Sequence, residues 1–219
     1  MIDQVLPPAQ APAVSAAIFK AYDIRGIVET ALTEEAVSAI GLALGAKARA
    51  RGIGQVVVGR DGRLSGPALA RALSAGLCAA GVDVIDIGMV PTPLVYFATV
   101  LTGCGTGVAV TGSHNPPEYN GLKMMLGGAT LHGEDIRDIA ATLADPARYA
   151  ALFAATPGTV RTQDVVPDYI ARIAGEVKLA RPLKVVVDAG NGVAGAVAPA
   201  LLRALGITDL TELYCEVDG

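Results

Sequence analysis

The chain has 219 residues, of which 52% are hydrophobic, 17% charged and 4% aromatic, and its formal net charge is −4 at pH 7. A length of this order allows one large domain, or one domain and part of another. The apolar fraction excludes an intrinsically disordered chain, which lacks the surface needed to offset the entropy of folding. The negative charge argues against nucleic acid as a partner, because a phosphate-neutralising basic excess is missing.

The hydropathy pattern predicts a protein without a membrane segment. Mean hydropathy is +0.48, and residues 87–113 carry no charge, but prolines and glycines interrupt that stretch where a spanning helix needs about 20 apolar residues. Residues 1–17 contain an acidic residue and prolines in place of signal-peptide features, so we expect a disordered leader and no export. Three cysteines at no metal-like spacing indicate reduced thiols, and together these features predict a cytoplasmic protein.

From about residue 19 onward, apolar runs of strand length alternate with periodic segments of helix length. The first helix, at 34–51, begins with acidic residues and ends with basic ones, as the helix dipole favours, and Gly52 ends it. The elements expected next are strands at 55–59, 82–87, 107–111 and 121–126, and helices at 66–80, 94–101 and 133–144. This alternation predicts an α/β fold with a mixed, mostly parallel sheet sandwiched by helices.

A shift to short polar and turn-forming stretches at 145–163 indicates a domain boundary. We therefore expect a disordered leader at 1–17, one complete α/β domain at 18–155 and a second region at 156–219. The second region is expected to contain, in order, a helix at 164–177, a strand at 183–188, a helix at 193–205 and a strand at 210–215. One βαβ unit cannot cover both faces of its own sheet, so we interpret this region as the start of a second, truncated α/β domain of the same type.

The most unusual segment is the loop TGSHNPPEYNG at 111–121. It follows an apolar strand, so Ser113 lies at a strand's carboxyl end, where open α/β sheets bind ligands. An ordinary surface turn with local hydrogen bonds explains the same residue types. Ser113 and His114 do not indicate a hydrolase, because no G-x-S-x-G elbow is present.

Two further loops carry basic residues on an otherwise charge-poor chain. They are KAYDIRGI at 20–27 and GRDGR at 59–63. The planar fork of arginine suits anionic groups, so these loops are candidates for an anion-binding cluster. Solvated loop charges paired with Asp23 and Asp61 are the alternative, and the pattern alone does not decide between them.

A glycine pattern at 190–195, GNGVAG, fits the dinucleotide-binding motif G-x-G-x-x-G. It follows a predicted strand and opens a predicted helix, with Glu212 and Glu216 where a ribose-binding acid could lie. However, Asn191-Gly192 is also an ordinary turn pair. A non-catalytic module that binds a dinucleotide or a phosphosugar through this loop is therefore an alternative function.

Taken in order, five segments resemble the α-D-phosphohexomutase superfamily, and most closely its bacterial phosphomannomutase/phosphoglucomutase branch. They are KAYDIRG at 20–26, VVGRDGRLSGPAL at 57–69, GMVPTPLVYFA at 88–98, TGSHNPPEYNGLK at 111–123 and VVVDAGNGVAG at 185–195. The resemblance runs from about residue 18 to residue 219. The phosphoglucosamine branch, which usually shows T-A-S-H-N-P and G-T-D-G-I-R-G, is the alternative within the superfamily.

The resemblance implies a role for individual residues. Ser113 matches the serine that carries the transferable phosphoryl group, and its phosphoserine oxygen ligates Mg²⁺. Arg25 matches a residue that holds this group. His114 and Lys123 match positions near the reacting hydroxyl, with Lys123 the better general acid/base candidate. The implied substrate-binding residues are Tyr22, Arg25, Asn115, Lys123, Arg60 and Arg63.

The implied reaction moves phosphate between the 6- and 1-positions of mannose or glucose through a bisphosphate intermediate. The expected partners are hexose phosphates and hexose bisphosphates, and the superfamily's enzymes are expected to be monomers. The superfamily has four domains, and its D-G-D-G-D-R metal loop and its later sugar- and phosphate-binding loops do not occur in this sequence. We therefore expect the 219-residue chain to be a fragment with negligible mutase turnover by itself.

Overall fold

The computed structural model describes residues 11–219, and the structural statements below refer to these residues. Residues 1–10 of the expected leader lie outside the described part. In its remaining part, Ala11 and Val14 pack against the main core, and Ala16–Ile18 form a short 3-10 helix, η1. The packed part of the chain therefore begins before residue 18. Within the described residues, no helix is both long and apolar enough to cross a membrane.

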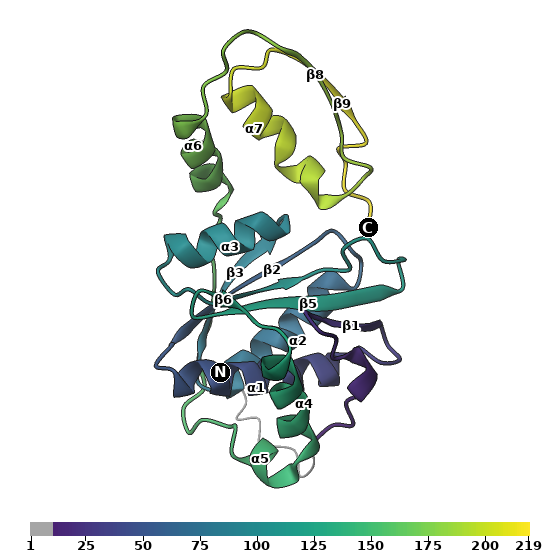
Figure 1. Cartoon of the computed structure of the whole chain (residues 1–219), viewed down its shortest axis with the longest axis vertical. Helices are drawn as coiled ribbons and strands as arrows, with labels where there is room; N and C mark the ends of the chain where they lie inside the picture. The colour runs from purple at the N-terminus through teal and green to yellow at the C-terminus, as the bar shows by residue number, and fades with distance from the viewer. Residues whose placement is uncertain (1–10) are drawn as a thin grey trace.

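One mixed sheet forms the centre of the larger part of the molecule (Figure 1). Its order is β1-β5-β4-β2-β3-β7, with β6 paired to β5. The parallel strands are β2 (Gln55–Arg60), β3 (Asp83–Met89), β4 (Gly107–Val110) and β7 (Val160–Thr162). β5 (Tyr119–Leu126) runs in the opposite direction and pairs antiparallel with β4, β1 (Ile24–Ile27) and β6 (Ala129–Thr130). β5 runs antiparallel to β4 because residues 111–118 connect them without a crossover helix.

Helices cover both faces of this sheet, which confirms the expected α/β sandwich. α1 (Glu34–Ala50), α2 (Gly66–Ala79) and α4 (Glu134–Ala144) lie on one face and α3 (Thr92–Leu101) on the other, with the short α5 (Pro146–Ala150) after α4 (Figure 1). α1 begins where Thr33 Oγ1 accepts the Ala36 N–H at 3.1 Å and ends before Gly52, whose φ is +74°. The helix bounds predicted from the end charges and Gly52 are thus confirmed to within one residue.

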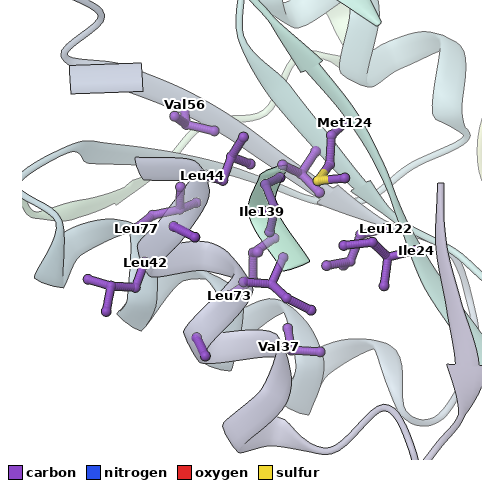
Figure 2. Packing of buried hydrophobic residues seen from close by; sticks show 14 of the residues in the cluster. Ile24, Val37, Leu42, Leu44, Val56, Leu73, Leu77, Leu122, Met124 and Ile139 are labelled. Atoms are coloured by element: carbon purple, nitrogen blue, oxygen red, sulfur yellow. The ribbon is translucent and has the colours of Figure 1, made fainter. Parts of the chain in front are cut away.

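The core consists of two clusters separated by the sheet. The larger joins the sheet to α1, α2 and α4, and Figure 2 shows Leu44, Leu73 and Leu77 below Val56 and Met124. The smaller joins the opposite face to α3. Because both faces are covered, side chains of β2 and β4 are buried on either side, which explains their uninterrupted apolar sequence.

The sheet extends past the boundary expected at residues 155/156. β7 pairs with β3 in parallel, and the Asp83 carboxylate accepts the Thr159 N–H at 2.8 Å and its hydroxyl at 2.9 Å. A strand of three exposed residues gives almost no apolar signal, so the sequence pattern assigns these residues to the expected boundary at 145–163. The first structural unit therefore ends after Thr162.

The second region contains α6 (Val166–Glu176), β8 (Lys184–Asp188), η2 (Val193–Ala196), α7 (Ala198–Ala204) and β9 (Asp209–Leu213). β8 and β9 form a separate two-stranded parallel sheet. The single helix expected at 193–205 is wrong: it divides into η2 and α7 at Val197, because Pro199 lacks an N–H and cannot continue a preceding helix. α6 lies over α3, where the rings of Phe97 and Tyr169 meet edge to face at 5.3 Å.

Candidate functional site

Two loops lie side by side at the carboxyl edge of the parallel strands. Residues 61–65 follow β2 and residues 111–118 follow β4, its neighbour in the sheet. The Asp61 N–H donates to the Val110 carbonyl at 2.9 Å, which joins the start of one loop to the end of the other strand. Lys123 lies on β5, the other neighbour of β4, and Arg25 lies on β1, which pairs with β5. The fold thus brings together polar segments that are far apart in the sequence.

Ser113 is exposed on the loop after β4, and its backbone φ is +55°. This left-handed conformation costs a residue with a Cβ about 1–2 kcal/mol. The Ser113 N–H donates to Thr111 Oγ1 at 2.9 Å, and its Oγ lies 3.2 Å from His114 Nδ1. An imidazole nitrogen at this distance can accept the hydroxyl proton when the ring carries its own proton on Nε2. The serine is therefore presented to solvent with a proton acceptor next to it.

Arg25 anchors the same loop from β1. Its side chain is buried, and it donates to the Thr111 carbonyl at 2.8 Å and to Asp23 Oδ2 at 2.7 Å. Gly121 faces Arg25 across the β1–β5 pair, and a Cβ there would press on the Arg25 guanidinium at 3.1 Å and overlap the Ile24 carbonyl. Glycine at 121 therefore makes room for the guanidinium beside the loop.

Lys123 lies near the ion pair between Arg25 and Asp23. Its Nζ lies 3.9 Å from Asp23 Oδ2, so Asp23 lies between the two cations of β1 and β5. Sequence reasoning did not identify Asp23 as an organising residue of the site. In the sequence, Asp23 stands two residues before Arg25 in Y-D-I-R-G, and in a strand this spacing places two side chains on the same face. Tyr22, next to it, is 76% exposed.

The remaining candidates differ in how available they are to a ligand. The Asn115 side-chain amide donates to the Gly112 carbonyl at 3.1 Å, so it supports the loop itself. Arg63 extends across the loop and donates to backbone carbonyls within it. Arg60 is half-buried and donates to the Asp61 carbonyl at 3.4 Å. The two arginines predicted as equivalent substrate-binding residues are thus placed differently.

The described residues by themselves do not fit a complete Mg²⁺ site. Mg²⁺ requires near-octahedral oxygen coordination, usually with one or two carboxylates. Among residues 11–219, no three or more His, Cys, Asp or Glu side chains gather at one point. Asp61, on the loop after β2, already accepts N–H groups from Arg63 and Gly112. The exposed Ser113 oxygen is therefore one isolated candidate ligand.

The cysteine with a shifted pKa lies away from this site. Burial, reinforced by the Asp83 carboxylate, raises the pKa of the Cys78 thiol to about 11. A thiol with this pKa is almost entirely protonated at neutral pH and is a poor nucleophile. Cys78 therefore does not compete with Ser113 as a nucleophile.

The glycine loop at 190–195 is occupied by its own hydrogen bonds. The N–H groups of Gly190, Asn191 and Gly192 donate to Asp188 Oδ1, the Tyr214 carbonyl and the Ala189 carbonyl. A dinucleotide site needs such N–H groups free to bind the pyrophosphate, followed directly by an α-helix. Here the loop leads into the 3-10 helix η2. The dinucleotide-binding alternative is therefore not favoured.

Together, fold and site define an α/β/α domain that presents one exposed serine at the carboxyl edge of its sheet, beside basic residues from neighbouring strands.

Comparison with known proteins identifies the family. A family model described as phosphoglucomutase/phosphomannomutase, alpha/beta/alpha domain I, matches residues 16–150. This match covers more than half of the chain, and the chain therefore belongs to the phosphoglucomutase/phosphomannomutase family. The resemblance predicted from the five sequence motifs is confirmed.

Individual relatives agree with this assignment. The chain is 51% identical over 202 residues to a phosphoglucomutase of Neisseria gonorrhoeae, which covers 92% of this chain and 43% of the relative. It is 47% identical over 211 residues to a phosphomannomutase/phosphoglucomutase of Pseudomonas aeruginosa, covering 96% and 44%.

A crystal structure of a phosphoglucomutase/phosphomannomutase family protein from Burkholderia thailandensis superposes with a TM-score of 0.86 at 48% identity, over 94% of this chain and 45% of that one. The chain thus spans less than half the length of the relatives that it matches.

Proposed function

We propose that this chain carries the phosphoryl-transfer serine of a mutase that interconverts hexose 6-phosphate and hexose 1-phosphate. One observation carries the proposal: the exposed Ser113 hydroxyl lies beside His114 on a loop that Arg25 anchors through the Thr111 carbonyl. Phosphoryl transfer requires positioning and charge stabilisation more than covalent chemistry, and a serine beside a base and fixed cations supplies both.

In the proposed reaction, phosphorylated Ser113 donates its phosphoryl group to a free hydroxyl of the hexose phosphate. The bond from Ser113 Oγ to phosphorus breaks as the bond from the sugar oxygen forms, and the product is a hexose bisphosphate. The sugar reorients, and Ser113 Oγ takes the other phosphoryl group. Lys123 is proposed as the acid/base for the sugar hydroxyl, and His114 as the acceptor of the Ser113 proton.

Mannose and glucose are the proposed sugars. The support is that the relatives at 47–51% identity are named phosphoglucomutase or phosphomannomutase/phosphoglucomutase. The phosphoglucosamine alternative has less support, because the loop has glycine at 112 where that branch usually has alanine. We further propose that the enzyme acts in the cytoplasm as a monomer.

Arg25 and Lys123 are proposed to bind the phosphoryl group and the sugar, with Tyr22 and Arg60 at the edge of the substrate site. Mg²⁺, when bound, supplies charge neutralisation on the transferring phosphoryl group. Ser113 Oγ is the proposed ligand from this chain, and its other oxygen ligands are proposed to come from outside residues 11–219. Residues after β7 are proposed to begin a second α/β domain. On these grounds we propose that these 219 residues alone show negligible turnover.

The first half-reaction tests this proposal directly. In a protein that joins these residues to the proposed remaining Mg²⁺ ligands, incubation with glucose 1,6-bisphosphate and Mg²⁺ is expected to leave one phosphate, on Ser113, as found by peptide mass spectrometry. The variant Ser113→Ala is expected to take up none. Ser15→Ala, which changes an exposed serine at the start of η1, serves as the matched control and is expected to label like the unchanged chain. Phosphate on a different residue, or equal labelling of Ser113→Ala, contradicts the proposal.

A further inference from the structure

The conformation of the loop at 111–118 has to be maintained against its own backbone preference. Ser113 has a φ of +55°, and a non-glycine residue stays in this region only where its surroundings enforce it. Within the loop, the Asn115 N–H and side-chain amide both donate to the Gly112 carbonyl at 3.1 Å. These local bonds fold the loop, but they do not attach it to the rest of the domain.

Arg63, from the neighbouring loop, makes that attachment. Its Nη1 donates to the carbonyls of Pro116 at 2.7 Å and Tyr119 at 3.0 Å. Its Nη2 donates to the carbonyls of Asn115 at 2.5 Å and Ser113 at 3.3 Å. All four acceptors belong to the segment 113–119, on both sides of its two prolines.

These bonds leave the guanidinium no capacity for a phosphate. A guanidinium has five N–H donors, and the four on Nη1 and Nη2 match the four carbonyls. The fifth, on Nε, faces Asp61 Oδ2 at 3.6 Å, and the side chain is only 14% exposed. Arg63 is therefore placed to hold the loop and not to contact a substrate, unlike the expectation drawn from its sequence position.

Asp61 and Gly112 complete the arrangement. Asp61 Oδ1 accepts the Arg63 N–H at 3.0 Å, and its Oδ2 accepts the Gly112 N–H at 2.9 Å. A Cβ at Gly112 would overlap the Nε of Arg63, so only glycine lets the side chain pass. Gly112 thus allows the Arg63 side chain to pass close to the loop backbone.

We propose that Asp61 and Arg63 are positioning residues that hold the loop 111–118 so that the Ser113 hydroxyl points at the incoming phosphoryl group. This inference rests on the proposed function of Ser113. It predicts that removing the arginine fork slows phosphoryl transfer without weakening the binding of the phosphorylated sugar. Lysine cannot replace arginine, because an ammonium offers a point charge with three donors in place of a planar fork.

The first measurement is the initial rate of Ser113 phosphorylation against the concentration of glucose 1,6-bisphosphate, followed by intact mass in the protein that also supplies the remaining Mg²⁺ ligands. Arg63→Lys is expected to lower the maximal rate roughly tenfold or more, since small misplacements of reacting groups have effects of this size. The half-saturating concentration is expected to change less than about twofold. A half-saturating concentration that rises while the maximal rate is kept shows that Arg63 binds the substrate, and overturns the proposal.

The second measurement needs no phosphoryl donor. In hydrogen exchange without ligand, Arg63→Lys and Asp61→Asn are expected to speed exchange of the Gly112 and Ser113 amides roughly tenfold, with α1 unchanged. Arg71→Lys, at an exposed arginine of α2, is the matched control and is expected to change neither. Unchanged exchange at Gly112 and Ser113 overturns the positioning role, whereas a Ser113 that never accepts phosphate in the unsubstituted protein with all Mg²⁺ ligands present defeats only the proposed function.

Discussion

The triplet Val-Val-Val occurs in two strands of this protein and meets two different environments. In β2, Val56, Val57 and Val58 are each 0% exposed. In β8, exposure alternates along the strand, and Val186 is 59% exposed. The residues and the secondary structure are the same, so the difference comes entirely from what surrounds each strand.

Neighbours explain the contrast. β2 lies between β4 and β3, with α2 on one face and α3 on the other. β8 has β9 as its one strand partner within the described residues, and α6 and α7 contain almost no buried side chain. A parallel strand becomes fully buried only when both edges and both faces are covered. We therefore expect residues 16–162 to supply most of the folding free energy.

The largest expected effect comes from truncating the same residue in both strands. Val57→Ala is expected to lower the free energy of unfolding by about 2–3 kcal/mol, because it removes two buried methyl groups and leaves a cavity. Val186→Ala is expected to cost less than about 0.5 kcal/mol, as for an exposed position. Urea denaturation followed by circular dichroism measures both. Equal losses contradict the idea that the second region contributes little buried surface.

Replacing one helical glycine in each region is expected to give effects of opposite sign. Gly76 of α2 lies against α1, where an added Cβ would overlap the Ser38 carbonyl, so Gly76→Ala is expected to cost about 1–3 kcal/mol. Gly175 of α6 has open space around it, so Gly175→Ala is expected to gain about 0.5 kcal/mol from helix propensity. Thermal unfolding of the two variants measures both effects. A lower stability of Gly175→Ala contradicts the open space around α6.

The smallest expected effect lies at β7, which joins the two regions. The Thr159 N–H and hydroxyl hold the pKa of Asp83 below its ordinary value, because both donate to the carboxylate. The carboxylate therefore stabilises the folded state above its unfolded pKa of about 3.9, and this contribution is lost as the pH falls through the lower folded pKa. We expect β7 to detach from β3 below about pH 4, with most other structure kept.

Hydrogen exchange of the amides near residues 159–163 as a function of pH measures this detachment. Asp83→Asn is expected to make that exchange fast already at neutral pH and to remove its acid dependence, and Thr159→Val to produce part of the effect. The pairing of β7 has a different origin if Asp83→Asn leaves the exchange unchanged.

Much of the first unit could be predicted from local patterns. The helix at 34–51 and the strand at 55–59 were placed within one residue by apolar periodicity, end charges and Gly52. β1 and β7 were missed, because strands of four and three residues with polar side chains carry too little periodicity. The helix at 193–205 was predicted as continuous, whereas Pro199 lies in the first turn of α7 and separates it from η2.

In the candidate site, too, the sequence indicated which residues matter, whereas the fold decided how each side chain is placed. The five ordered motifs were enough to indicate Ser113, Arg25 and Lys123 as the residues of interest. They gave Arg60 and Arg63 one shared role, since two arginines in a short loop look equivalent in a sequence. The direction of each side chain depends on the loop packed against it, and only the fold brings residues 113–119 to the Arg63 guanidinium.

Residue order thus determined the element types, the α/β class and the family, because periodicity, capping and motif spacing are local properties of the chain. The tertiary structure alone decided which of two identical valine triplets is buried, and which of two neighbouring arginines is saturated. Burial and hydrogen-bond capacity are set by partners 50 or more residues away, as in the bond from Arg63 to the Asn115 carbonyl across a separation of 52 residues.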